Sequence, residues 1–330
     1  MTLSPEPSTT WTEEVGPDEE ARHRELSERI SRLQLRLNDR FGPGRAFHRQ
    51  QIAGVHGELT ITASEPELRQ GLFSRTGSKP VVVRMSHGAI APHADVVPDI
   101  QGFALSVRRI SGPGALGGRT NRQDFLLINR PAFGLTSSRE FGDLIEPVAR
   151  GQAALARHLI AAHGPVSGSV ELARLTADIA RPFSGFATAR FHSAAPIAFG
   201  DYAAQVRLVP KGAGRRLTAP LDFHKDLAQR LRTDDLTYEL QVQFYLDDKT
   251  TPIEDLRHSW PTDASPFHPV ARLTLPQQDI DSEQGQDLAK DVETDRFDPW
   301  QALAAHRPLG EVMRARRAAY YSSAKNRGAG

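Results

Sequence analysis

Eight short segments of strand composition, divided four and four by a helical stretch, constrain the fold of this chain most. The first four lie at residues 54–63, 81–86, 102–110 and 124–129, and the second four at 185–191, 202–209, 238–246 and 270–275. They carry β-branched and aromatic residues and are bounded by turn-forming residues. Residues 139–181, between the two groups, are rich in alanine and leucine, as helices are. The pattern predicts an α+β fold with a closed antiparallel eight-stranded β-barrel and a helical insert.

Helices are expected to flank the barrel at both ends of the chain. Near the start, four apolar residues are spaced four, three and four apart within residues 18–40, as an amphipathic helix requires: Leu26, Ile30, Leu33 and Leu37. This helix docks on its own body or on a second subunit, which would make a homodimer. Residues 1–17 are polar and acidic and are expected to form a disordered leader. We therefore divide the chain into residues 1–40, the leader and helix, and residues 41–330, the barrel domain with a last helical region that follows Pro299.

Charge and composition exclude several classes of protein. The 41 Lys and Arg nearly balance the 40 Asp and Glu, which disfavours nucleic-acid binding. The chain has no cysteine, so disulfides, zinc-thiolate sites and covalently attached c-type haem are excluded. The N-terminal residues do not have the pattern of a secretory signal, and no stretch reaches the roughly 20 apolar residues of a membrane span. We expect a cytoplasmic protein without a membrane span.

The C-terminal helix has an unusual face. Five residues fall on one side of it when it is wound at about 3.6 residues per turn: Leu309, Val312, Met313, Arg316 and Tyr320. Arg316 and Tyr320 are four residues apart, so the guanidinium can lie against the phenol oxygen and favour the phenolate. A phenolate is an anionic ligand that can bind haem iron. The alternative is a basic surface helix whose tyrosines are incidental.

Several blocks of sequence, taken in order, resemble the haem catalases. They are Arg45 to His48 followed by GELTIT, VVVRMS, DIQGFA and DFLLINRPAF. Downstream, SGFATARFHSAAPIAFG, PIEDLRHSWP, SPFHPVARLTLPQQ and PLGEVMRARRAAYYSS are similar to a short, peroxidase-like branch of catalase-related proteins. The resemblance covers about residues 40–327. It implies the catalase-like barrel and a non-covalent haem b.

The resemblance also implies roles for individual residues on the distal side of the haem. His48 would be the acid/base that moves a proton between the two peroxide oxygens. Asn129 would donate a hydrogen bond to the peroxide, and Ser86 would hold the His48 ring. Arg45 and Arg84 would pair with the haem propionates, since the guanidinium group binds carboxylates with two parallel hydrogen bonds.

On the opposite side of the haem, the resemblance names the iron ligand. Tyr320 would bind the iron and Arg316 would favour its ionised form, in agreement with the helical face described above. Phe141 would stack on the haem. Heterolysis of a peroxide O–O bond needs electron donation from an anionic ligand and proton transfer by a neutral base, and this residue set supplies both.

Two residues depart from the catalase pattern. Phe47 stands where the full-length catalases have a small residue, and Gln51 stands where they have a glycine. We therefore expect a haem-dependent peroxidase that takes organic hydroperoxides with a small reductant and has weak activity on hydrogen peroxide. The alternatives are a haem lyase or isomerase that rearranges a fatty-acid hydroperoxide or a biosynthetic intermediate, and a non-catalytic haem-binding protein.

Overall fold

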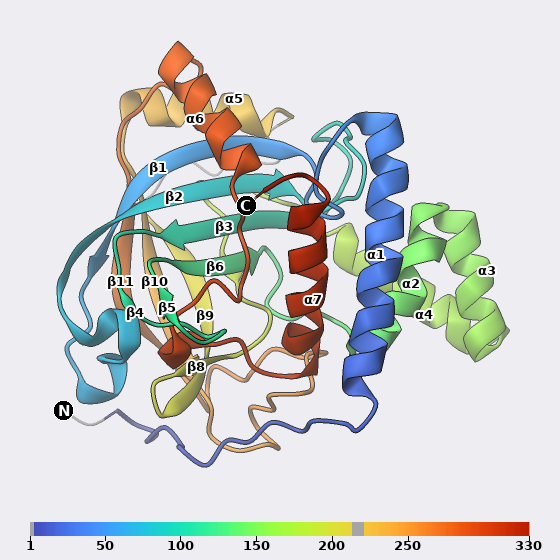
Figure 1. Ribbon diagram of the computed structural model, residues 1–330, viewed down its shortest axis with the longest axis horizontal. Helices are drawn as coiled ribbons and strands as arrows, with labels where there is room; N and C mark the ends of the chain where they lie inside the picture. The colour runs from blue at the N-terminus through green and yellow to red at the C-terminus, as the bar shows by residue number, and fades with distance from the viewer. Residues whose placement is uncertain (1–2, 213–220, 330) are drawn as a thin grey trace.

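The computed structural model describes residues 3–212 and 221–329, and their strands close into an antiparallel barrel (Figure 1). In order around the barrel, the strands are β10 (Leu236–Phe244), β11 (Phe267–Leu275), β1 (Gln51–Ile61), β2 (Gly77–His87), β3 (Gln101–Val107), β6 (Gln123–Ile128), β7 (Phe191–His192) and β9 (Tyr202–Lys211), which pairs with β10. Strand β8 (Ile197–Phe199) pairs with β9 outside the ring, and β4 (Gly112–Pro113) and β5 (Arg119–Thr120) form a separate hairpin. The predicted eight-stranded barrel is confirmed.

Alternation along the strands fills the barrel. Residues at every second position of β2 and β3 are buried in one apolar cluster: Val81, Val83, Met85, Phe103, Leu105 and Val107. Phenylalanines and Tyr238 occupy the rest of the interior, and the Tyr238 hydroxyl donates to the carbonyl of Phe186. The interior is therefore a packed core, and a site for a large ligand must lie on the outside of the barrel.

Seven of the eight predicted strands overlap the strands of the barrel, and one was wrong over most of its length. Residues 185–190 are not a strand, because the backbone N–H groups of Thr188 and Ala189 donate to the carbonyl of Gly185 and form a turn. Only Phe191 and His192 pair with the sheet. The aromatic residue within the turn, Phe186, contributes to the core instead of to a strand.

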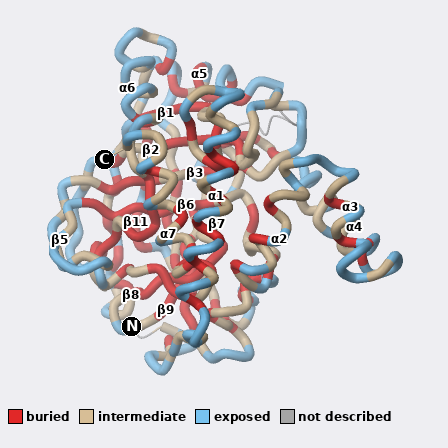
Figure 2. Tube along the Cα trace, turned by 45° about the vertical axis from the view of Figure 1, so that its right-hand side comes forward, coloured by how far each residue is buried: buried red, intermediate tan, exposed pale blue. Residues whose placement is uncertain are grey.

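The helices lie outside the barrel. They are α1 (Glu19–Phe41), α2 (Ser138–Ala149), α3 (Gln152–His163), α4 (Pro165–Ile179), α5 (Phe223–Thr233), α6 (Glu283–Thr294) and α7 (Glu311–Lys325), with 3₁₀ turns at Pro66–Leu68, Gly71–Ser74 and Ala304–His306. The predicted insert is the group α2 to α4, and Figure 2 shows α3 and α4 projecting from the body with largely exposed surfaces. Helices α5 and α6, which we did not predict, lie over β1 (Figure 1).

Helix α1 docks within its own chain. Leu26, Ile30 and Leu33 are buried against α7 and α2, and the contact includes Ala315 and Ala319. Figure 1 shows α1 and α7, from opposite ends of the chain, running side by side. The intramolecular alternative is therefore confirmed for this helix.

The leader also contacts the body, which differs from the expected disorder. The Ser8 N–H donates to the carbonyl of Tyr245, and the Trp11 indole N–H donates to the carbonyl of Asp201. Glu13 binds Arg314 on α7 at 2.6 Å. The leader was expected to be disordered because it is acidic, but its acidic side chains form ion pairs with the basic C-terminal helix. Among residues 3–212 and 221–329, no helix combines the length and apolar character needed to cross a membrane.

Candidate active site

The predicted site residues gather on the outer face of the barrel, where β2, β3 and β6 lie side by side. Met85 points into the core, so Arg84 and Ser86 on either side of it face outward. Ser86 pairs with Gly102 on β3, and Gly102 pairs with Ile128 on β6. A single row of outward-facing positions therefore crosses three strands.

His48 lies over this row, in the segment that joins α1 to β1. Its backbone has a φ of +52°, and its N–H donates to the carbonyl of Gly88 at 3.0 Å. Its Nδ1 lies 3.2 Å from Ser86 Oγ. The ring packs directly on Gly102, since a Cβ at that position would stand 2.5 Å from Nδ1. The glycine therefore leaves the space that the imidazole occupies.

The surroundings of His48 keep its ring neutral. Burial lowers the pKa of His48 to about 4, and the positive charge of Arg84 acts in the same direction. The charge of Arg316 on α7 also lowers this pKa, which brings the C-terminal helix and His48 into one site. Among the described residues, His48 Nε2 has no hydrogen-bond partner. At neutral pH this nitrogen can act as a base.

Asn129 follows β6, next to the same row. Its Oδ1 accepts the N–H of Gln101 at 2.8 Å, and its own N–H donates to the carbonyl of Gln101 at 3.0 Å. These two bonds fix the orientation of the amide, because Oδ1 must face the N–H donor. Within the described part of the chain, Asn129 Nδ2 has no partner. Asn129 thus offers a free donor one residue along β3 from Gly102.

The predicted pair on α7 forms as its spacing indicated. Arg316 donates to the Tyr320 hydroxyl oxygen at 2.7 Å, and its guanidinium carbon lies 5.0 Å from the ring centroid. Val312 and Met313, on the same side of the helix, are buried. Tyr321 is 61% exposed, so only the first of the two adjacent tyrosines lies on the inner face. The alternative of a purely surface helix is wrong.

Three arginines gather around Glu293 at the edge of the site, two of them on its carboxylate. Arg45 and Arg84, the expected propionate partners, bind the two carboxylate oxygens of Glu293 at 2.6 and 2.8 Å. Arg327 donates to the carbonyls of Glu293 and Asp295 at 3.2 and 3.1 Å. Burial lowers the pKa of Arg45 well below its ordinary value, and the nearby charge of Arg84 adds to the effect. The cluster has more cationic than anionic groups and can accept further carboxylates.

Aromatic residues form the apolar part of the site. Phe141 on α2 packs against Phe47, with ring centroids 5.4 Å apart, and against Phe133 at 5.8 Å. The two departures from the catalase pattern have different positions. Phe47 lies in this apolar group, whereas Gln51 points to α6, where its Nε2 donates to the carbonyl of Ala289 at 2.8 Å.

Comparison of the structure with solved structures identifies the architecture. A fungal catalase is 19% identical, with a TM-score of 0.68 over 89% of this chain and 61% of that chain. Catalase A from Saccharomyces cerevisiae is 18% identical, with a TM-score of 0.65 over 89% of this chain and 63% of the yeast chain. A bacterial catalase is 18% identical, with a TM-score of 0.61 over 89% of this chain and 59% of the bacterial chain. The fold is that of the catalases.

The likeness is one of structure. No protein-family model and no curated protein matches the sequence. The chain spans about three fifths of the length of these catalases, with 59% to 63% of each covered. Its catalase fold is therefore established, and its chemistry must be argued from its own residues.

Three members of the site were missed from the sequence. Gly102 was seen only as part of a block, although its place in a strand could have indicated a close approach by another group. Arg327 lies in the turn just after α7, which ends at Lys325, so the helical spacing did not indicate it. Glu293 gave no signal, since its partner Arg45 is 248 positions away.

The arrangement brings four chemical functions to one face of the catalase fold. His48 offers a neutral base, and Asn129 offers a hydrogen-bond donor. Arg316 and Tyr320 offer a phenol oxygen that accepts a hydrogen bond from a guanidinium group. The arginine cluster around Glu293 offers sites for carboxylates. Together these functions suit a flat anionic ligand and a substrate that exchanges a proton.

Proposed function

We propose that this chain is a b-type haem enzyme that acts on hydroperoxides, as a peroxidase that uses organic hydroperoxides and a small reductant and has weak catalase activity. Two observations together carry the proposal: Arg316, bonded to Tyr320, is near enough to lower the pKa of His48, and His48 Nε2 has no partner among the described residues. The three similar solved structures described above are catalases, which agrees with the proposal.

The residues present fit a haem. The Tyr320 oxygen accepts a hydrogen bond from Arg316 and is a ligand atom of the type that binds ferric iron. Arg45 and Arg84 would hold the propionates, because these two cations share the single side-chain carboxylate of Glu293, and Arg327, which donates to the backbone carbonyl of Glu293, lies beside them. The Phe47 and Phe141 rings supply an apolar surface for the porphyrin. Glu293 would then share its arginines with the incoming carboxylates.

Bound haem would supply the redox chemistry: it would give two electrons to the peroxide O–O bond, and the small reductant would restore them. The side chains of this chain handle the proton. In the tautomer that donates Nδ1–H to Ser86 Oγ, His48 has an Nε2 lone pair that takes the proton from one peroxide oxygen and returns it to the other, so that no net proton is lost. Asn129 Nδ2 donates a hydrogen bond to the peroxide, with its amide held by Gln101. The low pKa of His48 keeps this nitrogen unprotonated at neutral pH.

Replacement of Tyr320 tests the ligand. Purified protein loaded with haem is expected to show the absorption spectrum of a ferric high-spin tyrosinate haem. Tyr320→Phe is expected to change the spectrum and to lower peroxide turnover by about a hundredfold or more, since it removes the anionic ligand. Tyr321→Phe is the matched control, because Tyr321 is exposed and next in sequence. An unchanged spectrum in Tyr320→Phe, or a wild-type protein that takes up no haem, would contradict the proposal.

The same preparations decide among the reactions. Hydrogen peroxide, cumene hydroperoxide and a lipid hydroperoxide are supplied separately, with and without an electron donor. A peroxidase consumes the organic hydroperoxides only with the donor. Consumption of lipid hydroperoxide without a donor, with a rearranged product, indicates instead a lyase or isomerase. Haem binding without turnover of any substrate indicates a binding protein.

A further inference from the structure

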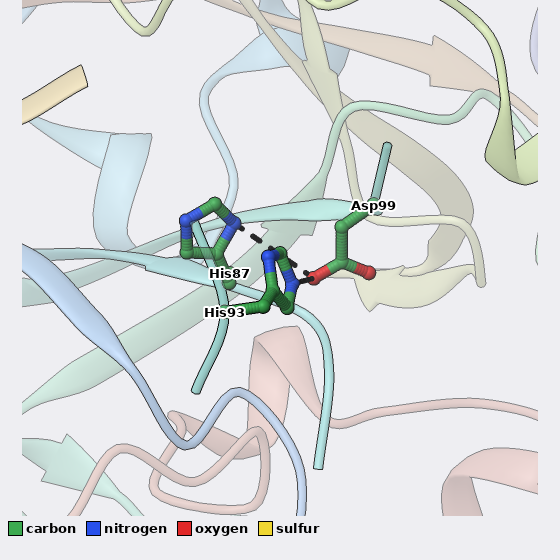
Figure 3. A group of neighbouring side chains, drawn as sticks. All are labelled: His87, His93 and Asp99. Atoms are coloured by element: carbon green, nitrogen blue, oxygen red, sulfur yellow. Dashed lines mark hydrogen bonds and ion pairs between the residues drawn. The ribbon is translucent and has the colours of Figure 1, made fainter. Parts of the chain in front are cut away.

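Two histidines and two aspartates form a compact group at the end of β2, apart from His48. His87 is the last residue of β2, and His93, Asp95 and Asp99 come from the loop that leads to β3. One ligand atom from each of His87, His93 and Asp99 lies within 4.8 Å of the others. Figure 3 shows the three side chains converging, with both histidines directed at one oxygen of Asp99.

The hydrogen bonds of His93 leave one ring nitrogen facing an acceptor. His93 Nδ1 lies 2.9 Å from the carbonyl of Ala94, which can only accept, so Nδ1 carries the hydrogen. In the neutral ring, Nε2 then has a lone pair. That lone pair faces Asp99 Oδ2 at 3.1 Å, and the same oxygen already accepts the N–H of Ala89 at 2.8 Å. Two acceptor atoms at this distance repel each other. A cation between Nε2 and Oδ2 would bind both and remove the repulsion.

His87 is arranged in the same way, with a carboxylate behind it. Its Nε2 lies 2.8 Å from Asp95 Oδ1, so Nε2 carries the hydrogen and Nδ1 has the lone pair. Nδ1 is 3.8 Å from Asp99 Oδ2. Histidines that bind metals commonly donate their other N–H to a carboxylate, which fixes the tautomer and makes the ligand nitrogen more basic. Asp95 holds His87 in this state.

Gln101 provides an independent sign that the cluster lacks a ligand. Its side chain is 1% exposed, and its Nε2 lies 3.1 Å from His87 Nδ1, so the amide is directed at the cluster. Its Oε1 is buried and has no hydrogen-bond partner among the described residues. A buried amide oxygen without a partner is unfavourable, because it has lost its hydrogen bonds to water without replacing them. Rotation of this amide would turn Oε1 toward His87 Nδ1, where a cation would accept it as a ligand.

The distances agree with a tetrahedral metal centre. Ligand atoms about 2.1 Å from a tetrahedral zinc ion lie about 3.4 Å from one another. The two observed separations from Asp99 Oδ2, 3.1 Å to His93 Nε2 and 3.8 Å to His87 Nδ1, lie on either side of this value. Imidazole nitrogens combined with a carboxylate suit Zn²⁺ and similar divalent ions of the first transition row.

We propose that His87, His93 and Asp99 bind one divalent transition-metal ion of the zinc type, with Asp95 orienting His87 and Gln101 near the fourth position. The ion would join the end of β2 to the loop that precedes β3. This loop also carries Gly88 and Ala89, whose carbonyls accept the N–H groups of His48 and Arg49. The metal centre would thus stabilise the segment that holds His48, and it does not depend on the proposed haem.

Zinc binding by the full-length protein tests the proposal. The protein is treated with a chelator, dialysed against buffered Zn²⁺, and analysed for zinc and iron separately, so that haem iron is not counted. Wild type is expected to bind one zinc ion per chain. His93→Ala is expected to weaken binding about a hundredfold or more, and Asp95→Asn about 10- to 100-fold, as for other residues that orient a metal ligand. His163→Ala, at an exposed position on α3, is the control and should bind as wild type.

His93 is the ligand chosen for substitution because its side chain is 18% exposed, whereas His87 is fully buried. Replacing zinc with Co²⁺ gives a second measurement, since a tetrahedral site with nitrogen ligands yields characteristic visible absorption bands. Absence of one-to-one binding in wild type overturns the proposal. Equal zinc affinity in wild type and a folded His93→Ala protein overturns it as well.

Discussion

At the scale of single residues, Gly102 determines where the His48 ring lies. The ring occupies the space that a side chain at position 102 would fill, and Ser86 Oγ borders the same space at 3.0 Å. His48 itself has a backbone conformation that non-glycine residues adopt infrequently. It is held there by hydrogen bonds from its own N–H and that of Arg49. The strained backbone at this residue agrees with a functional role for it.

We predict that Gly102→Ala displaces the His48 ring and breaks its contact with Ser86. If His48 transfers the proton, peroxide turnover should fall by about 10²- to 10⁴-fold. Haem content and the ferric spectrum should not change. The atoms nearest to the added Cβ belong to His48 and Ser86, and not to the iron ligand Tyr320. Gly16→Ala is the control, since the Cβ would meet no atom closer than 3.6 Å. Normal turnover in Gly102→Ala would show that the ring position does not matter.

A contact within the site could be predicted from the sequence only where both of its residues lie on the same helix or strand. Arg316 and Tyr320 are on one helix, so their contact followed from the helical period. The meeting of Arg45 with Glu293 spans 248 positions and depends on how α6 lies over β1. No local pattern encodes such a contact. The resemblance to catalases supplied His48 and Asn129, but it did not reveal that Gln101 orients the Asn129 amide.

At the scale of elements, the pairing of α1 with α7 joins the two ends of the chain around a buried amide. The Gln34 side chain on α1 is 0% exposed. Its Nε2 donates to the carbonyls of Gly44 and Ser323 at 2.8 and 3.1 Å, and its Oε1 accepts from Asn326 at 3.2 Å. One side chain therefore links α1, the segment that leads to His48, and the C-terminal turn of α7.

We predict that Gln34→Leu lowers the free energy of unfolding by about 1 to 3 kcal/mol for each carbonyl left buried without a donor. Urea denaturation followed by circular dichroism measures the change. Leu35→Ala is the control on the next residue of α1, where the side chain is 49% exposed and the expected change is within about 0.5 kcal/mol. A Gln34→Leu protein as stable as wild type would show that the amide does not support the pairing of the helices.

The elements missed from the sequence were short helices with limited apolar faces. Helix α6 buries Val292, which packs closely on Gly54 of β1. A Cβ on Gly54 would lie only 2.8 Å from Val292. Helix α5 does have an amphipathic pattern, with Phe223, Leu227 and Leu231 at intervals of four. That signal was present but short. The strands of the barrel were easier to predict, because β-branched and aromatic residues bounded by turn-forming residues recur along the chain, and β1, β2 and β10 are nine to eleven residues long.

At the scale of the whole molecule, opposite charges at the two ends of the chain meet. Arg314 on α7 binds Glu13 in the leader at 2.6 Å, Glu19 on α1 at 2.5 Å and Glu254 at 3.4 Å. The near-zero net charge of the sequence concealed this separation into an acidic beginning and a basic end. The ion pairs place the leader along the barrel, and α7 is thereby covered by residues from three parts of the chain.

Buried histidines make the stability of the whole molecule dependent on pH. Burial lowers the pKa of His48, His192 and His306 from the ordinary 6.5 to about 4. Between these values the unfolded chain binds protons that the native chain does not, so the free energy of unfolding falls as the pH falls. His224 acts in the opposite direction, because its hydrogen bond to Asp281 contributes to a raised pKa, although burial alone would lower it. Because these three histidines have a lowered pKa and only one described histidine, His224, has a raised one, the protein should lose stability as the pH falls below about 6.5.

His306 allows this prediction to be tested at one residue. It is 0% exposed, and its Nε2 accepts the N–H of Leu72 at 2.9 Å, a bond that a protonated ring cannot form. Each such histidine should cost wild type about 2 kcal/mol between pH 7 and pH 5, a range in which most carboxylates remain ionised. His306→Gln lowers stability at every pH, so the measured quantity is the slope of unfolding free energy against pH, which should become smaller by about 1 kcal/mol per pH unit over this range. The exposed His163→Gln control should keep the wild-type slope. An equal slope in His306→Gln would mean that the native protein tolerates a charge at this position, with the loss of the Leu72 hydrogen bond compensated elsewhere.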